Sequence, residues 1–213
     1  LVFSKTKGTF TEIKSHGNDI LTNQGGPMLH LWRAPHRNDD MWADESWNKF
    51  GLKKLTWTVT KASYKQKDDN NVEITAELEG KGRNGFAVTH KVKYEINGDG
   101  TIKADNDLSF TNEAIPLARV GVRLMLNKSY DQFDYFGRGP MENYIDRKRG
   151  FDVGWYKSTV KQQLTPYEKP MEAGNHEDVR WARVSNSTGS SLTVKKDTAL
   201  LQVSALPYSD EEM

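Results

Sequence analysis

The feature that most constrains this chain is a segment in which apolar residues recur at every second position. Between residues 86 and 96 the alternate positions hold Phe86, Val88, His90, Val92, Tyr94 and Ile96. Successive side chains of a β-strand point to opposite faces, so this period predicts a long strand with one face in a core. One apolar and one polar face are typical of antiparallel sheets that pack face to face. The pattern therefore predicts an all-β, antiparallel sandwich.

Other segments repeat this period and predict the remaining strands. Long strands are expected at residues 55–59, 72–78, 102–110 and 120–126, and short ones at 2–4, 10–14, 28–32, 192–195 and 200–203. The run Asn97-Gly98-Asp99-Gly100 tolerates a positive φ and should close a hairpin. Two short helices are expected, one over residues 39–50 with Gly51 as its C-cap and one over 140–147 with Pro140 at its first position.

Length and composition limit the class of protein. With 213 residues, 6 Trp and 8 Phe, the chain can form the core of a single β-sandwich domain over residues 1–213. The 30 basic and 29 acidic residues give a net charge of +1, which provides no field to attract nucleic acid or an anionic membrane. No apolar run approaches the roughly 20 residues of a membrane span. The absence of cysteine excludes disulfides and thiolate metal sites but leaves the compartment, cytoplasm or periplasm, open.

The sequence at both ends of the chain is typical of an internal segment. Residues 1–4 resemble an interior strand without an initiator methionine, and the last predicted strand stops at a polar end, residues 209–213. We therefore expect an incomplete piece of a longer, multidomain protein.

The first of two polar motifs spans residues 135–147 and mixes Gly, Pro, Arg, carboxylates and aromatics, as functional loops on a β frame do. On the expected helix, Glu142 and Asp146 lie four residues apart on one face, with Arg147 adjacent and Arg138 near the start. These groups either hold sugar hydroxyls or form a structural salt-bridge network, and the network is favoured. We expect Arg138 and Arg180 to pair with nearby carboxylates such as Glu142, Asp146, Glu172 or Asp178.

The second motif spans residues 166–181 and offers acids, amides and aromatics without a diagnostic spacing: Glu168, Glu172, Asn175, His176, Glu177, Asp178, Arg180 and Trp181. A glycosidase needs two facing carboxyl groups, and a pair formed by Glu142 and Glu172 is the less favoured interpretation. The spacing of His30 and His36 does not suit a metal pair, so a structural or surface role is favoured. Three aromatics, Trp57, Trp155 and Tyr167, either stack on sugars or fill the core, and the core is favoured.

In their order and spacing, the motifs resemble the C-terminal domain of large bacterial β-galactosidases of glycoside hydrolase family 2. The resemblance rests on Trp32-Arg33-Ala34-Pro35 with Asn38-Asp39, on Gly137-Arg138-Gly139-Pro140 with Glu142-Asn143-Tyr144 and Asp146-Arg147, and on Pro166-Tyr167 with Gly174-Asn175 and Asp178-Val179-Arg180-Trp181. The chain departs from the family at His36-Arg37, where Thr-Asp is usual, and at Ala173, where Asn is frequent.

The resemblance implies a β-supersandwich of the galactose-mutarotase-like kind, the last of five domains of the parent enzyme. It places both catalytic glutamates on a preceding barrel, and the aromatic that this domain adds to the galactose pocket beyond Met213. No catalytic residue, metal ligand or cofactor is therefore expected in this chain, and any Mg²⁺ or Na⁺ would belong to the catalytic region. The implied partners are the remaining domains and, in the full enzyme, the galactoside substrate.

The favoured function is the non-catalytic C-terminal domain of a retaining β-galactosidase, which packs on the catalytic barrel, shapes the sugar pocket and is inactive alone. The alternatives are an independent carbohydrate-binding module and a mutarotase-like epimerase, which needs a histidine, His90 or His176, converging with Glu142 or Glu172. The motif residues carried forward as candidates are Trp32, Arg33, Asn38, Asp39, Arg138, Glu142, Asn143, Asp146, Arg147, Glu172, Asn175, Asp178, Arg180 and Trp181.

Overall fold

The structure is a computed structural model that describes residues 1–39, 43–111, 115–169 and 171–212. Strands contain 47% of the residues and helical turns 7%. Every pair of neighbouring strands is antiparallel. The expected fold class, an all-β antiparallel sandwich, is confirmed.

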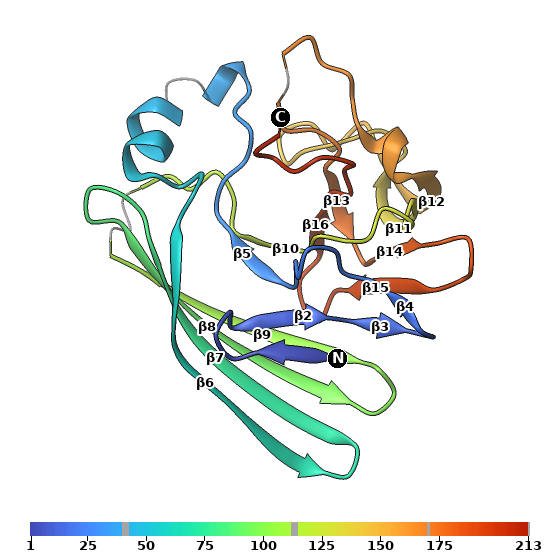
Figure 1. Ribbon diagram of the computed structural model, residues 1–213. Coiled ribbons are helices and arrows are strands. Elements are labelled where there is room, and N and C mark those ends of the chain that lie inside the picture. Colours follow the sequence, from blue (N-terminus) through green and yellow to red (C-terminus); the bar gives the residue numbers. More distant parts are fainter. Residues whose placement is uncertain (40–42, 112–114, 170, 213) are drawn as a thin grey trace. The chain divides into compact units, whose positions relative to one another are not determined.

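The chain divides into two compact units (Figure 1), and the expectation of a single domain stays a prediction. Unit 1 comprises residues 1–13, 23–33 and 37–125, and unit 2 comprises residues 14–22, 34–36 and 126–213. The elements of unit 1 are β1 (Val2–Ser4), β2 (Thr9–Glu12), β5 (Met28–His30), the 3₁₀ turn η1 (Arg37–Asp39), the π-helical η2 (Ala43–Asn48), β6 (Thr56–Asp68), β7 (Asn71–Lys81), β8 (Ala87–Asn97), β9 (Ile102–Phe110) and β10 (Gly121–Arg123).

Unit 1 is built on a four-stranded sheet in the order β6, β7, β8, β9, which Figure 1 shows as long strands lying side by side. The predicted alternation is present, because Val88, Val92 and Tyr94 are buried while Lys91 between them is exposed. Tyr94 packs against Phe10 of β2 with ring centroids 4.9 Å apart. The long strands that the sequence predicts here are therefore confirmed, and β10 is shorter than expected.

The helix expected over residues 39–50 is not one regular α-helix. Its described part consists of η1, η2 and a final turn at residues 49–50, while Met41 and Trp42, which the sequence pattern uses, lie outside the described residues. Gly51 ends the segment at φ +71° as predicted, and its N–H donates to the Asn48 carbonyl. The buried Trp47 fixes the segment because its indole N–H donates to the Pro116 carbonyl at 2.7 Å.

Unit 2 contains β3 (Lys14–Ser15), β4 (Asn18–Asp19), β11 (Gln132–Gly139), β12 (Asp152–Thr159), the 3₁₀ turn η3 (Val160–Gln163), β13 (His176–Val179), β14 (Trp181–Ser185), β15 (Ser191–Lys195) and β16 (Leu201–Val203). Its main sheet has the order β12, β11, β14, β15, and β13 pairs with β16. A cluster of Phe133, Tyr135, Val179 and Ala182 forms the core. Both polar motifs lie largely in this unit and contribute strands that their composition did not predict.

The helix expected over residues 140–147 is wrong: the segment is a series of turns and bends. One backbone bond, from the Arg147 N–H to the Tyr144 carbonyl, closes a local turn, but key bonds of the segment go to residues more than 30 positions away. The Asn143 N–H donates to the Asn175 carbonyl, and the Glu142 carboxylate accepts from the Gly174 N–H. Helix propensity is a weak preference that such tertiary contacts override.

Across the described residues, the structure contains no helix long and apolar enough to cross a membrane.

Candidate functional site

The polar network of unit 2 begins at the end of β11, where Arg138 binds three partners. Its Nε donates to Asp178 Oδ2 at 2.5 Å, and its Nη1 donates to the backbone carbonyls of Phe151 at 2.7 Å and Lys148 at 3.3 Å. Lys148 Nζ lies 3.1 Å from the other oxygen of Asp178. The expected pairing of Arg138 with a carboxylate is therefore confirmed.

Asp178 occupies a left-handed backbone conformation, φ +54°, within β13, where the register with β16 shifts between His176 and Val179. Asp is one of the few residues that tolerate this region, since its short polar side chain bonds locally. The hydrogen bond from Arg138, together with Lys148, holds the pKa of the Asp178 carboxyl below its usual value. The carboxylate is thus charged and already committed to two cations.

Glu142 is a buried carboxylate whose two oxygens are both occupied. Oε2 accepts from the Gly174 N–H at 2.7 Å, and Oε1 accepts from Arg147 Nη2 at 2.5 Å and from the Tyr167 hydroxyl in a short contact. Burial alone would raise the pKa of Glu142, but the hydrogen bonds from Tyr167, Gly174 and Arg147 lower it overall. A carboxylate with this pKa and these donors is a poor general acid.

Asn143 joins the two motifs and is completely buried, with 0% of its surface exposed. Its Nδ2 donates to the carbonyls of Arg138 and Met141, both at 3.0 Å, and its Oδ1 accepts from the Glu177 N–H at 2.9 Å. The Nδ2 of Asn175 in turn donates to the backbone carbonyl of Asn143 at 2.7 Å. Each such bond satisfies a backbone group that burial would otherwise leave costly.

His176 lies on β13 beneath this network. Its ring nitrogens lie 3.1 Å from the Arg138 carbonyl and 2.6 Å from Gln163 Oε1, and its ring centroid is 4.1 Å from that of Tyr135. Burial lowers the pKa of His176 to about 4, although the Arg138 carbonyl acts in the opposite direction. A histidine enclosed in this way is not positioned as an acid in an open cleft, so the epimerase alternative gains no support.

Four other candidates of the second unit contribute less to the network. Asp146 is exposed on the turn. Arg180 Nη1 donates a hydrogen bond to the backbone carbonyl of Asp178. The guanidinium carbon of Arg180 lies 5.6 Å from the centroid of the Phe136 ring. Trp181 is half-buried and lies edge-on to Trp155. Glu172 is buried, and its N–H donates to the Ala34 carbonyl at 3.1 Å.

The candidates of the Trp32-Arg33 motif lie in unit 1. Arg33 Nη2 lies 2.9 Å from both oxygens of the buried Asp39, Trp32 is buried, and Asn38 is exposed. Lys53 Nζ lies 4.8 Å from the centroid of the Trp32 ring. Arg33 and Asp39 thus form a local ion pair that holds the last residue of η1.

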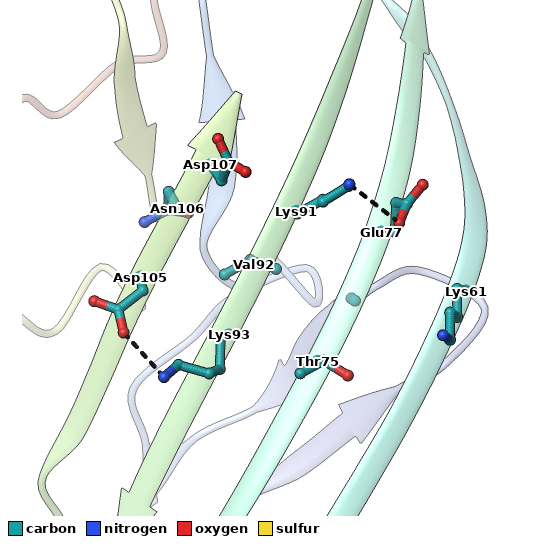
Figure 2. A pocket seen from close by; sticks show the side chains of 10 residues that line it. Lys61, Thr75, Glu77, Lys91, Val92, Lys93, Asp105, Asn106 and Asp107 are labelled. Carbon is teal, nitrogen blue, oxygen red and sulfur yellow. Dashed lines mark ion pairs between the residues drawn. The ribbon is translucent and has the colours of Figure 1, made fainter. Parts of the chain in front are cut away.

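An open concavity of about 350 Å³ lies on one face of the β6 to β9 sheet. Figure 2 shows that charged side chains line it, with ion pairs from Lys91 to Glu77 and from Lys93 to Asp105. The register sets Lys61, Glu77, Lys91 and Asp107 opposite one another on successive strands, so charges alternate across the sheet. Such cross-strand pairs stabilise a solvated sheet face, and the concavity offers no aromatic platform among its lining residues.

Sequence reasoning missed several partners of the network. Lys148, Gln163 and the Gly174 N–H carry bonds that no motif spacing indicates, although the positive φ of Gly174, +71°, is a property that glycine itself suggests. The core interpretation is wrong for Trp155 and Tyr167, which are exposed, whereas Trp57 is half-buried and packs over Gly80. Among the residues that the structure describes, no group of three or more His, Asp or Glu side chains is arranged to hold a metal ion.

Comparison with known proteins assigns the whole chain to one family. The family model described as beta galactosidase small chain matches residues 1–213. A β-galactosidase of Priestia megaterium is 32% identical over 219 residues, which cover 100% of this chain and 20% of that protein. A β-galactosidase of Lactobacillus delbrueckii subsp. bulgaricus is 32% identical with 98% of this chain covered, and one of Kluyveromyces lactis is 24% identical with 91% covered.

The chain spans about a fifth of the length of these relatives. The match runs through both units and through all three motifs. This chain therefore belongs to the beta galactosidase small chain family.

Proposed function

We propose that this chain is the non-catalytic C-terminal region of a retaining β-galactosidase that hydrolyses terminal β-D-galactosides. The observation that carries the proposal is the match of residues 1–213 to the small-chain family, combined with the small share of each β-galactosidase that the chain covers. The remaining four-fifths of such an enzyme has room for a catalytic barrel, and these residues then pack on it and help to shape the sugar pocket.

The chemistry of the network supports a structural role. Retaining hydrolysis divides the work of a nucleophile and an acid between two carboxyl groups about 5 Å apart. Both oxygens of Glu142 accept hydrogen bonds from donors within the chain, and Asp178 is bound to Arg138 and Lys148. Neither carboxylate is free to attack a sugar or to deliver a proton. We assign no catalytic residue, metal ligand or cofactor to this chain, and any Mg²⁺ or Na⁺ belongs to the catalytic region.

The proposal is tested with three proteins: the isolated 213-residue chain, the full-length enzyme read from its gene, and that enzyme with these residues deleted. Each is incubated with o-nitrophenyl β-galactoside. We expect turnover from the full-length enzyme, none above buffer from the isolated chain, and a large loss in the deletion. Turnover by the isolated chain that disappears on Glu142→Gln would overturn the proposal, as would a deletion that retains full activity.

A further inference from the structure

One surface of unit 2 presents aromatic side chains to solvent in a single row. The register sets Phe136 of β11 opposite Trp155 of β12 on one side and opposite Trp181 of β14 on the other. Residues opposite one another in neighbouring strands point to the same face. This face is the outer one, because Phe133 and Tyr135, which point to the opposite face of β11, belong to the core. We call Trp155, Phe136 and Trp181 the aromatic row.

Two of the three rings in the row are exposed although they are large and apolar, and Trp181 is half-buried. Trp155 is 61% exposed and Phe136 37% exposed, and Val153, one register step along β12 from Trp155, is also exposed. Single exposed apolar residues are ordinary, but contiguous ones on a soluble protein mark interaction surfaces. Trp is moreover among the residues enriched in the hot spots near the centres of protein interfaces.

The ring geometry favours a protein over a sugar as the occupant. Trp155 and Trp181 meet with centroids 5.7 Å apart at an interplanar angle of 75°, and Lys157 Nζ lies 5.0 Å from the Trp155 centroid. Arg180 covers the ring of Phe136. A sugar ring stacks on a flat, open aromatic face, whereas here the rings are tilted against one another and cations lie over two of them. The row therefore presents ring edges and apolar side-chain surface, which suit contact with protein side chains.

The rim of the row is cationic. Lys157 lies beside Trp155, Arg180 lies over Phe136, and Lys195 is opposite Trp181 in the β14 to β15 register. Asp134, which the register sets opposite Lys157, is already paired with Arg183. Two copies of this surface would repel one another, while a partner with carboxylates around an apolar centre would be attracted.

Trp155 also stands on the edge of its sheet. In the described part of the chain, β12 has β11 as its one strand neighbour. An edge strand with an exposed apolar side chain is a surface that proteins normally cover.

We propose that the aromatic row is the surface on which the rest of the parent β-galactosidase packs, through a segment with acidic side chains around an apolar one. The inference rests on the proposed function, because the chain spans about a fifth of its relatives and the other four-fifths supplies the occupant. Trp155 is the central contact, and Lys157 and Arg180 orient the acidic rim.

Hydroxyl-radical footprinting of the isolated chain and of the full-length enzyme tests whether the aromatic row is covered in the full-length enzyme. Tyr64 is a matched control, because it is 66% exposed, lies on the edge strand β6 and has Lys5 Nζ 5.2 Å from its ring centroid. Trp155 should lose most of its oxidation in the full-length enzyme, while Tyr64 retains it. Trp155→Ala and Lys157→Gln should lower the thermal inactivation temperature of the full-length enzyme by several degrees, and by more than they lower the melting temperature of the isolated chain. Tyr64→Ala should change neither.

The other outcomes separate this inference from the proposed function. If the full-length enzyme hydrolyses the galactoside but Trp155 is oxidised equally in both proteins, the aromatic row is not the packing surface and the proposed function stands. Protection of Trp155 in the isolated chain by added galactose would identify a sugar platform instead. Concentration-dependent dimerisation of the isolated chain that Trp155→Ala abolishes would identify a contact between copies. A full-length enzyme without galactosidase activity would remove both proposals.

Discussion

At the scale of single residues, Arg138 is the cation that joins three separate parts of the network. It binds the carboxylate of Asp178 and two backbone carbonyls, and about a quarter of its side chain is exposed. Because its removal leaves those partners without a donor, Arg138→Ala should lower the free energy of unfolding by about 1–3 kcal/mol. Urea unfolding of the isolated chain at pH 7 measures the change.

The neighbouring Arg149 supplies the control for this prediction. Arg149 is exposed, and Arg149→Ala should change stability by no more than about 0.5 kcal/mol, as surface substitutions usually do. Equal urea midpoints for the two variants would show that the ion pairs of Arg138 are solvated contacts of little weight.

A second prediction at this scale concerns pH. Burial holds the pKa of His176 at about 4, below the usual value of 6.5. Since the unfolded chain then binds a proton more readily than the folded one, stability is complete above pH 6.5 and is lost as the pH falls toward 4. The free energy of unfolding that depends on this pKa difference is about 3 kcal/mol. Urea midpoints at pH 7 and pH 4.5 should differ by less in His176→Gln than in the parent chain, and an unchanged difference would contradict the assignment.

At the scale of elements, Gly137 of β11 lets β13 approach closely. A Cβ on Gly137 would lie 2.6 Å from Cγ2 of the fully buried Val179 and 3.1 Å from its Cα, so backbone as well as side chain would have to move. Overpacking of this kind costs about 1–3 kcal/mol. Gly137→Ala should therefore lower the thermal midpoint of the isolated chain, whereas Gly150→Ala, which would meet no atom within 4 Å, should not. A midpoint that Gly137→Ala leaves unchanged would show that β13 can shift without cost.

The same elements show what the sequence pattern can and cannot predict. Strands β7 and β8 follow the alternation closely, because one face of each packs on the core and period two records that burial, whereas β9 forms as predicted but has no fully buried residue. Strand β11 escaped prediction since Gly137, Arg138 and Gly139 follow its two core aromatics, and glycine and arginine give no apolar period. The helix proposed from Pro140 failed because its hydrogen bonds go to residues 174 and 175, which no local pattern reveals.

The candidate site was predictable in its members more than in its geometry. The density of charged residues identified Arg138, Glu142 and Asp178, and the pairing of Arg138 with a carboxylate followed from charge alone. The pairing of Glu142 with Tyr167 and Gly174 depends on how two distant segments fold together. The exposure of Trp155 also depends on tertiary context, because an aromatic on a strand fits either face.

At the scale of the whole molecule, charge is balanced both in total and locally. Basic and acidic residues number 30 and 29, and many pair across strands or within the network. A chain with this balance has no field that would concentrate a polyanion. The aromatic row is a local exception, because it combines exposed apolar area with the cations Lys157 and Arg180.

The last prediction distinguishes a structural network from a sugar-binding one in the full-length enzyme. Glu142→Gln keeps the shape of the side chain but faces the Gly174 N–H and Arg147 with a neutral amide, so the enzyme should lose thermal stability. If Glu142 touches only protein, kcat/KM for o-nitrophenyl β-galactoside at 25 °C should stay within about threefold, because no bond in the transition state is lost. A carboxylate that bound or attacked the sugar would instead cost roughly a hundredfold or more in kcat/KM. Such a loss in a variant that circular dichroism shows to be folded would place Glu142 in the sugar pocket, and the network would then have to be regarded as part of the active site.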